Sequence, residues 1–107
     1  MNEPPLSELG VLASMMADET SRSSALAMEH LTVDDFTGDL HKTLFEACRN
    51  LPAPYGDLDV AIATGLDADC FRIADMYTGG DVTRYIDLMI AARQTKEVRA
   101  ALLTATD

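Results

Sequence analysis

The sequence predicts an all-α fold, a compact bundle of about six helices that ends in a long antiparallel helical hairpin. Apolar residues recur at helical spacing in successive segments, and no segment of useful length alternates apolar and polar residues as a strand does. The chain has 107 residues, 48% of them hydrophobic, with only 6 Gly and 4 Pro, which suffices for one buried core. We therefore expect a single helical domain over residues 1–107.

The first two expected helices are short. The first covers about residues 5–17, because Pro5 suits the first turn of a helix and apolar residues then follow at helical spacing. The second covers about residues 21–30, after a polar stretch that is rich in capping residues. His30 falls at its C-terminal end, where an imidazolium interacts favourably with the helix dipole, so we expect a capping role and not a ligand role.

The segment of residues 39–51 has the clearest helical period, and we expect it to be the central helix, with Asp39 as its N-cap. Its apolar stripe comprises Leu40, Leu44, Ala47, Cys48 and Leu51. Just before it, Thr32 and Asp35 have the spacing of a capping pair, which predicts a single helical turn over residues 32–35.

Two short helices and one long helix are expected after Pro52. Their expected ranges are 58–64, 68–77 and 82–104, with Asp57, Asp67 and Asp81 as caps and Gly65 as the C-terminal residue of the first. Gly79 and Gly80 provide a tight turn, so that the last two helices form the hairpin.

The long helix has two apolar edges. One comprises Val82, Tyr85, Met89 and Ala92, and the other Ile86, Ile90, Val98 and Leu102. This apolar surface is broader than one neighbouring helix requires. Either the preceding helix covers all of it, or part of it is buried in a second subunit.

The chain is strongly acidic, with a formal net charge of −10. The whole excess lies in residues 1–80, which hold 14 acidic and 4 basic side chains, whereas residues 81–107 are neutral. Direct binding of nucleic acid or of an anionic membrane is not expected, because binding a polyanion needs clustered Lys and Arg. The acidic part either keeps the domain solvated or faces a basic protein partner.

Cys48 and Cys70 fall on apolar stripes, so we expect them to be reduced core residues of a cytoplasmic protein. No pair among these cysteines, His30 and His41 has ligand-type spacing, and no metal site is expected. Residues 1–5 lack the basic and apolar regions of a secretory signal. The longest apolar run is too short to span a bilayer.

No catalytic or cofactor-binding motif occurs in the sequence. A phosphate-binding glycine loop, HExxH, GxSxG and CxxC are all absent. Paired carboxylates such as Asp57 and Asp59 lie at helix starts, where they stabilise the helix. His41 has no evident nucleophile or orienting partner, so we expect it to make a structural hydrogen bond. The chain is expected to be no enzyme and to bind no cofactor.

Three segments resemble the N-terminal domain of DnaB-type replicative DNA helicases. Residues 8–16, ELGVLASMM, are similar to the family pattern E-x-x-V-L-G-x-M-L, and residues 85–89 resemble its Y-x-x-I-V stretch. The most specific match is to L-x-x-x-D-F-Y-x-x-x-H-x-x-I-F, carried by Leu31, Asp35, Phe36, His41, Leu44 and Phe45. Ala13 in place of the usual Gly and Thr37 in place of the usual aromatic indicate a divergent member, such as one encoded by a phage or mobile element.

The resemblance implies a scaffold and not a motor. In the family, this domain forms the collar of a hexameric ring, its C-terminal helical hairpin pairs two copies, and it binds the C-terminal domain of primase. ATP hydrolysis belongs to a separate domain. Carried over to this chain, the hairpin spans Ala68 to about Arg99. The residues expected on its exposed contact surface are Tyr77, Tyr85, Ile86, Met89 and Arg93.

The leading prediction is therefore a non-catalytic interaction and oligomerisation module of DNA replication, which self-associates as a dimer or a larger ring and binds primase. One alternative is the helicase-binding domain of a primase, which shares this helical fold. Another is an acidic regulator that binds a basic replication protein. A hydrolase would require an activity that depends on Asp35 or His41.

Overall fold

Six α-helices and one 3-10 turn make up the part of the chain that the computed structural model describes, residues 6–18, 22–52, 54–77 and 82–105, with 103–105 as backbone only. They are α1 (Leu6–Ala17), α2 (Arg22–His30), η1 (Val33–Asp35), α3 (Asp39–Asn50), α4 (Asp57–Thr64), α5 (Asp67–Ala74) and α6 (Val82–Ala105). No strand occurs within these residues. The predicted all-α bundle is confirmed.

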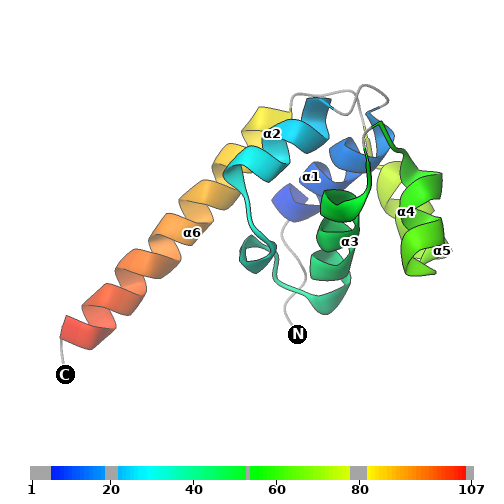
Figure 1. Ribbon diagram of the computed structural model, residues 1–107. Coiled ribbons are helices and arrows are strands. Elements are labelled where there is room, and N and C mark those ends of the chain that lie inside the picture. The colour runs from blue at the N-terminus through cyan, green and yellow to red at the C-terminus, as the bar shows by residue number, and fades with distance from the viewer. Residues whose placement is uncertain (1–5, 19–21, 53, 78–81, 106–107) are drawn as a thin grey trace.

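Helix α1 is the centre of the bundle. It contacts α2, α3, α4, α5 and α6 (Figure 1), and every residue from Val11 to Met16 is buried. A helix that is buried on all sides can carry a polar side chain only where its hydrogen bonds are satisfied. Ser14 meets this condition because its hydroxyl donates to the carbonyl of Gly10 at 2.8 Å. Helix α3, expected to be central, instead packs on one side of α1.

The helix ends follow the sequence closely. Asp39, Asp57 and Asp67, predicted as N-caps, are instead the first residues of α3, α4 and α5. Their carboxylates still lie in the first turn, where the helix dipole favours a negative charge. Gly65 ends α4 in the left-handed conformation at φ 72°, as predicted.

The predicted turn before α3 is also present. Thr32 and Asp35 form the expected capping pair around η1, in which the Asp35 carboxylate accepts the Thr32 backbone N–H at 2.9 Å. Gly79, Gly80 and Asp81, predicted to form a turn and a cap, lie outside the described residues.

The C-terminal hairpin differs from the prediction. Helix α5 ends at Ala74 and packs mainly on α4 and α1, whereas α6 packs on α1, α2 and η1. Within the described residues, α5 and α6 therefore do not form a long antiparallel pair. The 24 residues of α6 span about 36 Å, and its C-terminal half projects from the bundle (Figure 1).

The core contains both cysteines. Cys48 and Cys70 are fully buried, as predicted, and form no disulfide. Among the described helices, none has the length and apolar character needed to cross a lipid bilayer.

Candidate interaction surface and its supporting contacts

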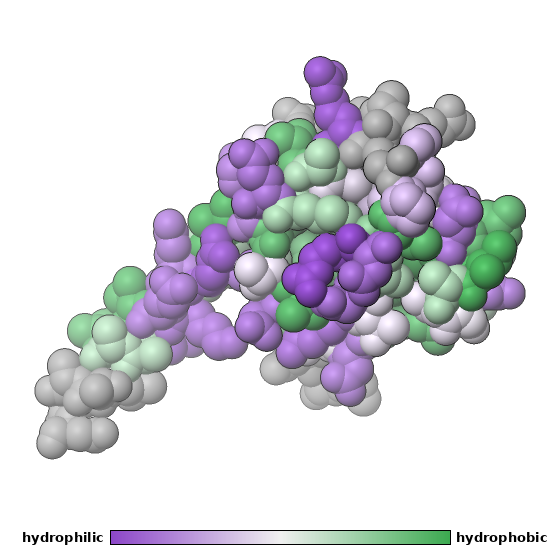
Figure 2. Space-filling model, viewed as in Figure 1, coloured by the Kyte–Doolittle hydropathy of each residue, from purple (hydrophilic) through white to green (hydrophobic). Residues whose placement is uncertain are grey.

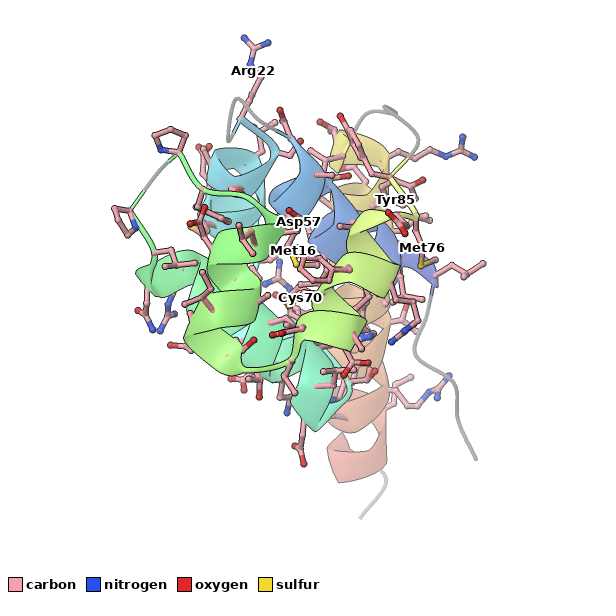
Figure 3. The ribbon with its side chains drawn as sticks, turned by 90° about the vertical axis from the view of Figure 1, so that its right-hand side faces the viewer. Met16, Arg22, Asp57, Cys70, Met76 and Tyr85 are labelled. Carbon is pink, nitrogen blue, oxygen red and sulfur yellow. The ribbon has the colours of Figure 1, made fainter. Side chains whose placement is uncertain are left out.

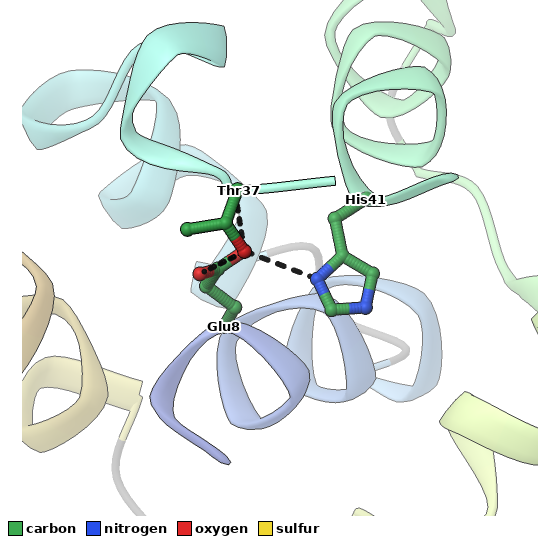
Figure 4. Close-up of polar contacts among 3 residues, drawn as sticks. All are labelled: Glu8, Thr37 and His41. Atoms are coloured by element: carbon green, nitrogen blue, oxygen red, sulfur yellow. Dashed lines mark hydrogen bonds and ion pairs between the residues drawn. The ribbon is translucent and has the colours of Figure 1, made fainter. Parts of the chain in front are cut away.

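A polar cluster of Glu8, Thr37 and His41 joins α1 to the start of α3 (Figure 4). The Glu8 carboxylate is 2% exposed and accepts the Thr37 backbone N–H at 2.8 Å and the Thr37 hydroxyl at 3.0 Å. Nδ1 of His41 lies 3.1 Å from Oε1 of Glu8, within hydrogen-bond distance. The structural hydrogen bond predicted for His41 is therefore present, and its partner, Glu8, was not predicted from the sequence.

This cluster holds the structure together, and its histidine is closed to substrates. The imidazole of His41 is only 3% exposed, so a reacting molecule has no access to it. Each hydrogen bond to the buried Glu8 carboxylate offsets part of the free-energy cost of removing that carboxylate from water. The three residues thereby fix the loop before α3 against the first turn of α1.

His41 belongs to the most specific motif of the resemblance, whose other residues include Asp35, Phe36, Leu44 and Phe45. The rings of Phe36 and Phe45 pack with their centroids 4.7 Å apart, and Leu44 is fully buried. The Asp35 carboxylate also accepts a hydrogen bond from Arg93 of α6 at 3.3 Å. The motif therefore ties α1, η1, α3 and α6 into one unit.

The five residues predicted as an exposed contact surface mostly face the bundle. Ile86 is 2% exposed and Met89 is 4% exposed, so the expectation that they lie on an open surface is wrong. The first half of α6 packs on α1 and α2, and these side chains fill that contact. Tyr77, Tyr85 and Arg93 are half-buried.

The contact between α1 and α6 depends on a glycine. A Cβ atom at Gly10 would lie 2.6–2.7 Å from three ring atoms of Tyr85, far inside ordinary contact distance. The absence of a side chain at Gly10 lets the Tyr85 ring lie directly on α1.

The side of α6 that faces away from the bundle is open to solvent. Every residue from Gln94 to Leu102 is exposed, and the Val98 side chain is 59% exposed. We define the outer stripe as Leu88, Ala91, Thr95, Val98 and Leu102, which recur at intervals of 3, 4, 3 and 4 residues. Four of these residues also line a shallow apolar groove along the helix, and Figure 2 shows hydrophobic side chains reaching its surface.

Burial lowers the reactivity of the two thiols. Burial raises the pKa of the Cys48 thiol from 9.0 to about 11, and burial also raises the pKa of the Cys70 thiol. Since the thiolate is the reactive form, both groups are protonated at neutral pH. Within the described residues, no group of three or more His, Cys, Asp or Glu side chains is arranged to hold a metal ion.

No protein-family model, curated protein or solved structure matches this chain. The resemblance to the replicative helicase domain therefore rests on the three segments described above and stays a prediction.

Proposed function

We propose that the protein is a non-catalytic interaction and oligomerisation module of DNA replication, in which the outer stripe of α6 pairs with a second copy. The observation that carries this proposal is the outer stripe itself, which begins at Leu88 and continues onto the half of α6 that projects from the bundle. Apolar positions at alternating intervals of 3 and 4 residues keep one face of a helix turned toward a partner helix over its whole length.

A partner helix would also stabilise the projecting half of α6. An isolated helix of about 12–15 residues is marginal in water, and residues 94–102 are all exposed. Pairing would bury Leu88, Val98 and Leu102 of both copies, at roughly 1–2 kcal/mol per side chain. Since association costs about 4–15 kcal/mol, we expect a dimer that dissociates on dilution.

The charge of α6 opposes the pairing of two copies less than the charge of the rest of the surface does. The helix holds four basic side chains, Arg84, Arg93, Lys96 and Arg99, and two acidic ones, Asp87 and Glu97. Its formal charge is +2 (4 − 2), in a chain whose net charge is −10. Two copies that meet through α6 therefore keep their acidic surfaces apart, which lowers the repulsion between them.

The replication context rests on the resemblance and on how its segments pack. Glu8 and His41 come from two different segments of the resemblance, and their side chains are in contact. This contact supports treating those segments as one structural unit. Under the proposal the module works in the cytoplasm, its partner is the C-terminal domain of primase, and the motor lies in another domain.

Molar mass measured by light scattering tests self-association. The wild-type protein is expected to show a mass that rises with concentration from one copy to two. Val98→Asp places a charge in the paired stripe and should hold the mass at one copy. Ile62→Asp, at an apolar residue of α4 that is even more exposed than Val98, is the matched control and should behave as the wild type. A wild-type mass of one copy at every concentration would refute pairing through α6.

Calorimetric titration with the C-terminal domain of primase tests the replication role separately. Saturable binding is the expected result. Absence of binding by a protein that still dimerises would remove primase and leave oligomerisation. Absence of both would favour the acidic regulator, a function that the net charge of −10 supports and whose complexes weaken strongly with salt.

A further inference from the structure

A second apolar surface lies on α4 and α5. Apart from Leu6 and Met76, the large hydrophobic side chains that are exposed within the described residues lie on two parts of the molecule, α6 and the α4–α5 pair. We define the α4–α5 face by Leu58, Ile62 and Phe71. Leu58 and Ile62 are one helical turn apart and so share one side of α4, and α5 packs directly on α4. Ile62 is 74% exposed, and Figure 2 shows hydrophobic side chains at this end.

The segment that forms this surface is rich in acidic residues. Residues 57–75 hold five aspartates, Asp57, Asp59, Asp67, Asp69 and Asp75, and one basic residue, Arg72, for a formal charge of −4 (1 − 5). Arg72 is already paired with Asp69 at 3.1 Å. Most of the negative charge along the α4–α5 face is therefore not compensated by a basic side chain of this segment.

The acidic surface continues into an adjoining groove between α1, α4 and the end of α5. The groove is lined by Met16, Tyr55, Asp57, Asp59 and Asp75, among other residues, and Figure 3 shows Met16 and Asp57 at this end of the molecule. Here too carboxylates and apolar atoms are interleaved. A ligand for this region must offer apolar contacts and positive charge together.

We propose that the α4–α5 face docks a basic amphipathic helix of a different protein. A helix of this kind presents apolar residues at positions i, i+3, i+4 and i+7 to the face and places Lys or Arg beside the aspartates. Contact between the α4–α5 faces of two copies is disfavoured, because it would bring the same −4 segment against itself, and contact of the face with α6 of a second copy is an outcome of the test below. Nucleic acid and anionic lipid are repelled by the same charge.

This inference does not depend on self-association through α6. The two surfaces lie at opposite ends of the bundle (Figure 1), and their charges have opposite signs. A chain that dimerises through α6 leaves both of its α4–α5 faces free, so that each copy carries one partner helix.

The test uses a fluorescein-labelled peptide of 18 residues, composed of Leu and Lys at the spacing of an amphipathic helix, and the full chain. Binding is followed by fluorescence anisotropy at two salt concentrations. The comparison peptides have the same composition in scrambled order, or Glu in place of Lys. The variant Ile62→Ser/Phe71→Ser removes apolar surface from the face, and Asp67→Asn/Asp75→Asn removes charge. Matched controls elsewhere are Leu88→Ser/Val98→Ser and Asp34→Asn/Asp87→Asn.

The apolar variant of the face should weaken peptide binding about tenfold or more, and the charge variant about threefold, with a smaller salt dependence. Both matched controls should bind as the wild type does. Unchanged binding by Ile62→Ser/Phe71→Ser, equal binding of the scrambled peptide, or an equal loss in the α6 control would overturn the inference. So would a lower self-associated mass of Ile62→Ser/Phe71→Ser, because the face would then be a contact between copies.

Discussion

Substitution of Gly10 by alanine tests the close packing of α6 on α1. Gly10 lies inside α1, where alanine is favoured over glycine by about 1 kcal/mol in helix propensity. The new methyl group would meet Cγ, Cδ1 and Cε1 of the Tyr85 ring at 2.6–2.7 Å. Propensity and packing therefore act on the free energy of unfolding in opposite directions.

The packing effect is expected to be the larger one. Carbon atoms make their best contact at about 3.5–4.0 Å, so the ring must retreat by about 1 Å, and overpacking of this kind costs about 1–3 kcal/mol. Gly10→Ala should therefore destabilise the protein by about 1 kcal/mol. In a Tyr85→Ala background the clash is gone, and the same substitution should stabilise the protein by about 1 kcal/mol.

The assay is chemical unfolding of the four proteins of this double-mutant cycle, followed by circular dichroism at one fixed protein concentration. The expected coupling energy between the two sites is about 1–3 kcal/mol, with a change of sign for Gly10→Ala between backgrounds. Equal stabilisation by Gly10→Ala in both backgrounds would refute the direct contact between the Tyr85 ring and α1.

Three further predictions concern the buried groups. Glu8→Ala should destabilise the protein by about 3–5 kcal/mol and Glu8→Gln by about 1–2 kcal/mol, since glutamine keeps one acceptor for the Thr37 N–H; urea unfolding that ranks the two equally would contradict this. Both thiols should resist Ellman's reagent at pH 8 and react only in denaturant. Because the folded-state pKa of Cys48 is raised from 9.0 to about 11, its contribution to stability is complete below pH 9 and is lost as the pH rises toward 11, and Cys48→Ala should flatten that decline. Met89→Asp should destabilise the folded chain by more than about 3 kcal/mol, whereas Val98→Asp should change monomer stability by less than about 0.5 kcal/mol; similar unfolding midpoints for the two would show that Met89 is not buried.

The fold was predictable because helical period and helix ends are local properties of the sequence. Even so, the most amphipathic segment, α3, is not the centre of the bundle. A strong amphipathic period marks a helix that is buried on one side only. Helix α1 is buried on every side from Val11 to Met16, and this burial removes the contrast that would have marked it as central.

The contact surface was only partly predictable. The sequence shows that α6 has more apolar surface than one neighbour needs, and Val98 and Leu102 belong to one of its two apolar edges, but they were not among the predicted contact residues. It could not tell which edge the bundle covers, because this depends on where α1 and α2 lie in space. The contact of α6 with α1 and α2 buries Ile86 and Met89 and leaves Val98 exposed.

The pairing of Glu8 with His41 was missed for a similar reason. The two residues are 33 positions apart, and no local pattern joins them. One indication was available: Glu8 directly precedes the largely apolar residues 9–16, and His41 lies one residue after Leu40 of an apolar stripe. A carboxylate and an imidazole in such surroundings need partners, and each can serve as the partner of the other.

Amide hydrogen exchange of residues 94–102, measured as a function of protein concentration, tests pairing through α6 most directly. The exposed half of α6 should exchange quickly when the chain is monomeric, because few contacts stabilise it, and its protection should rise with concentration. Val98→Asp should abolish this rise, while Ile62→Asp should not. Protection of residues 94–102 that does not change with concentration in the wild-type protein would contradict the proposed role of α6.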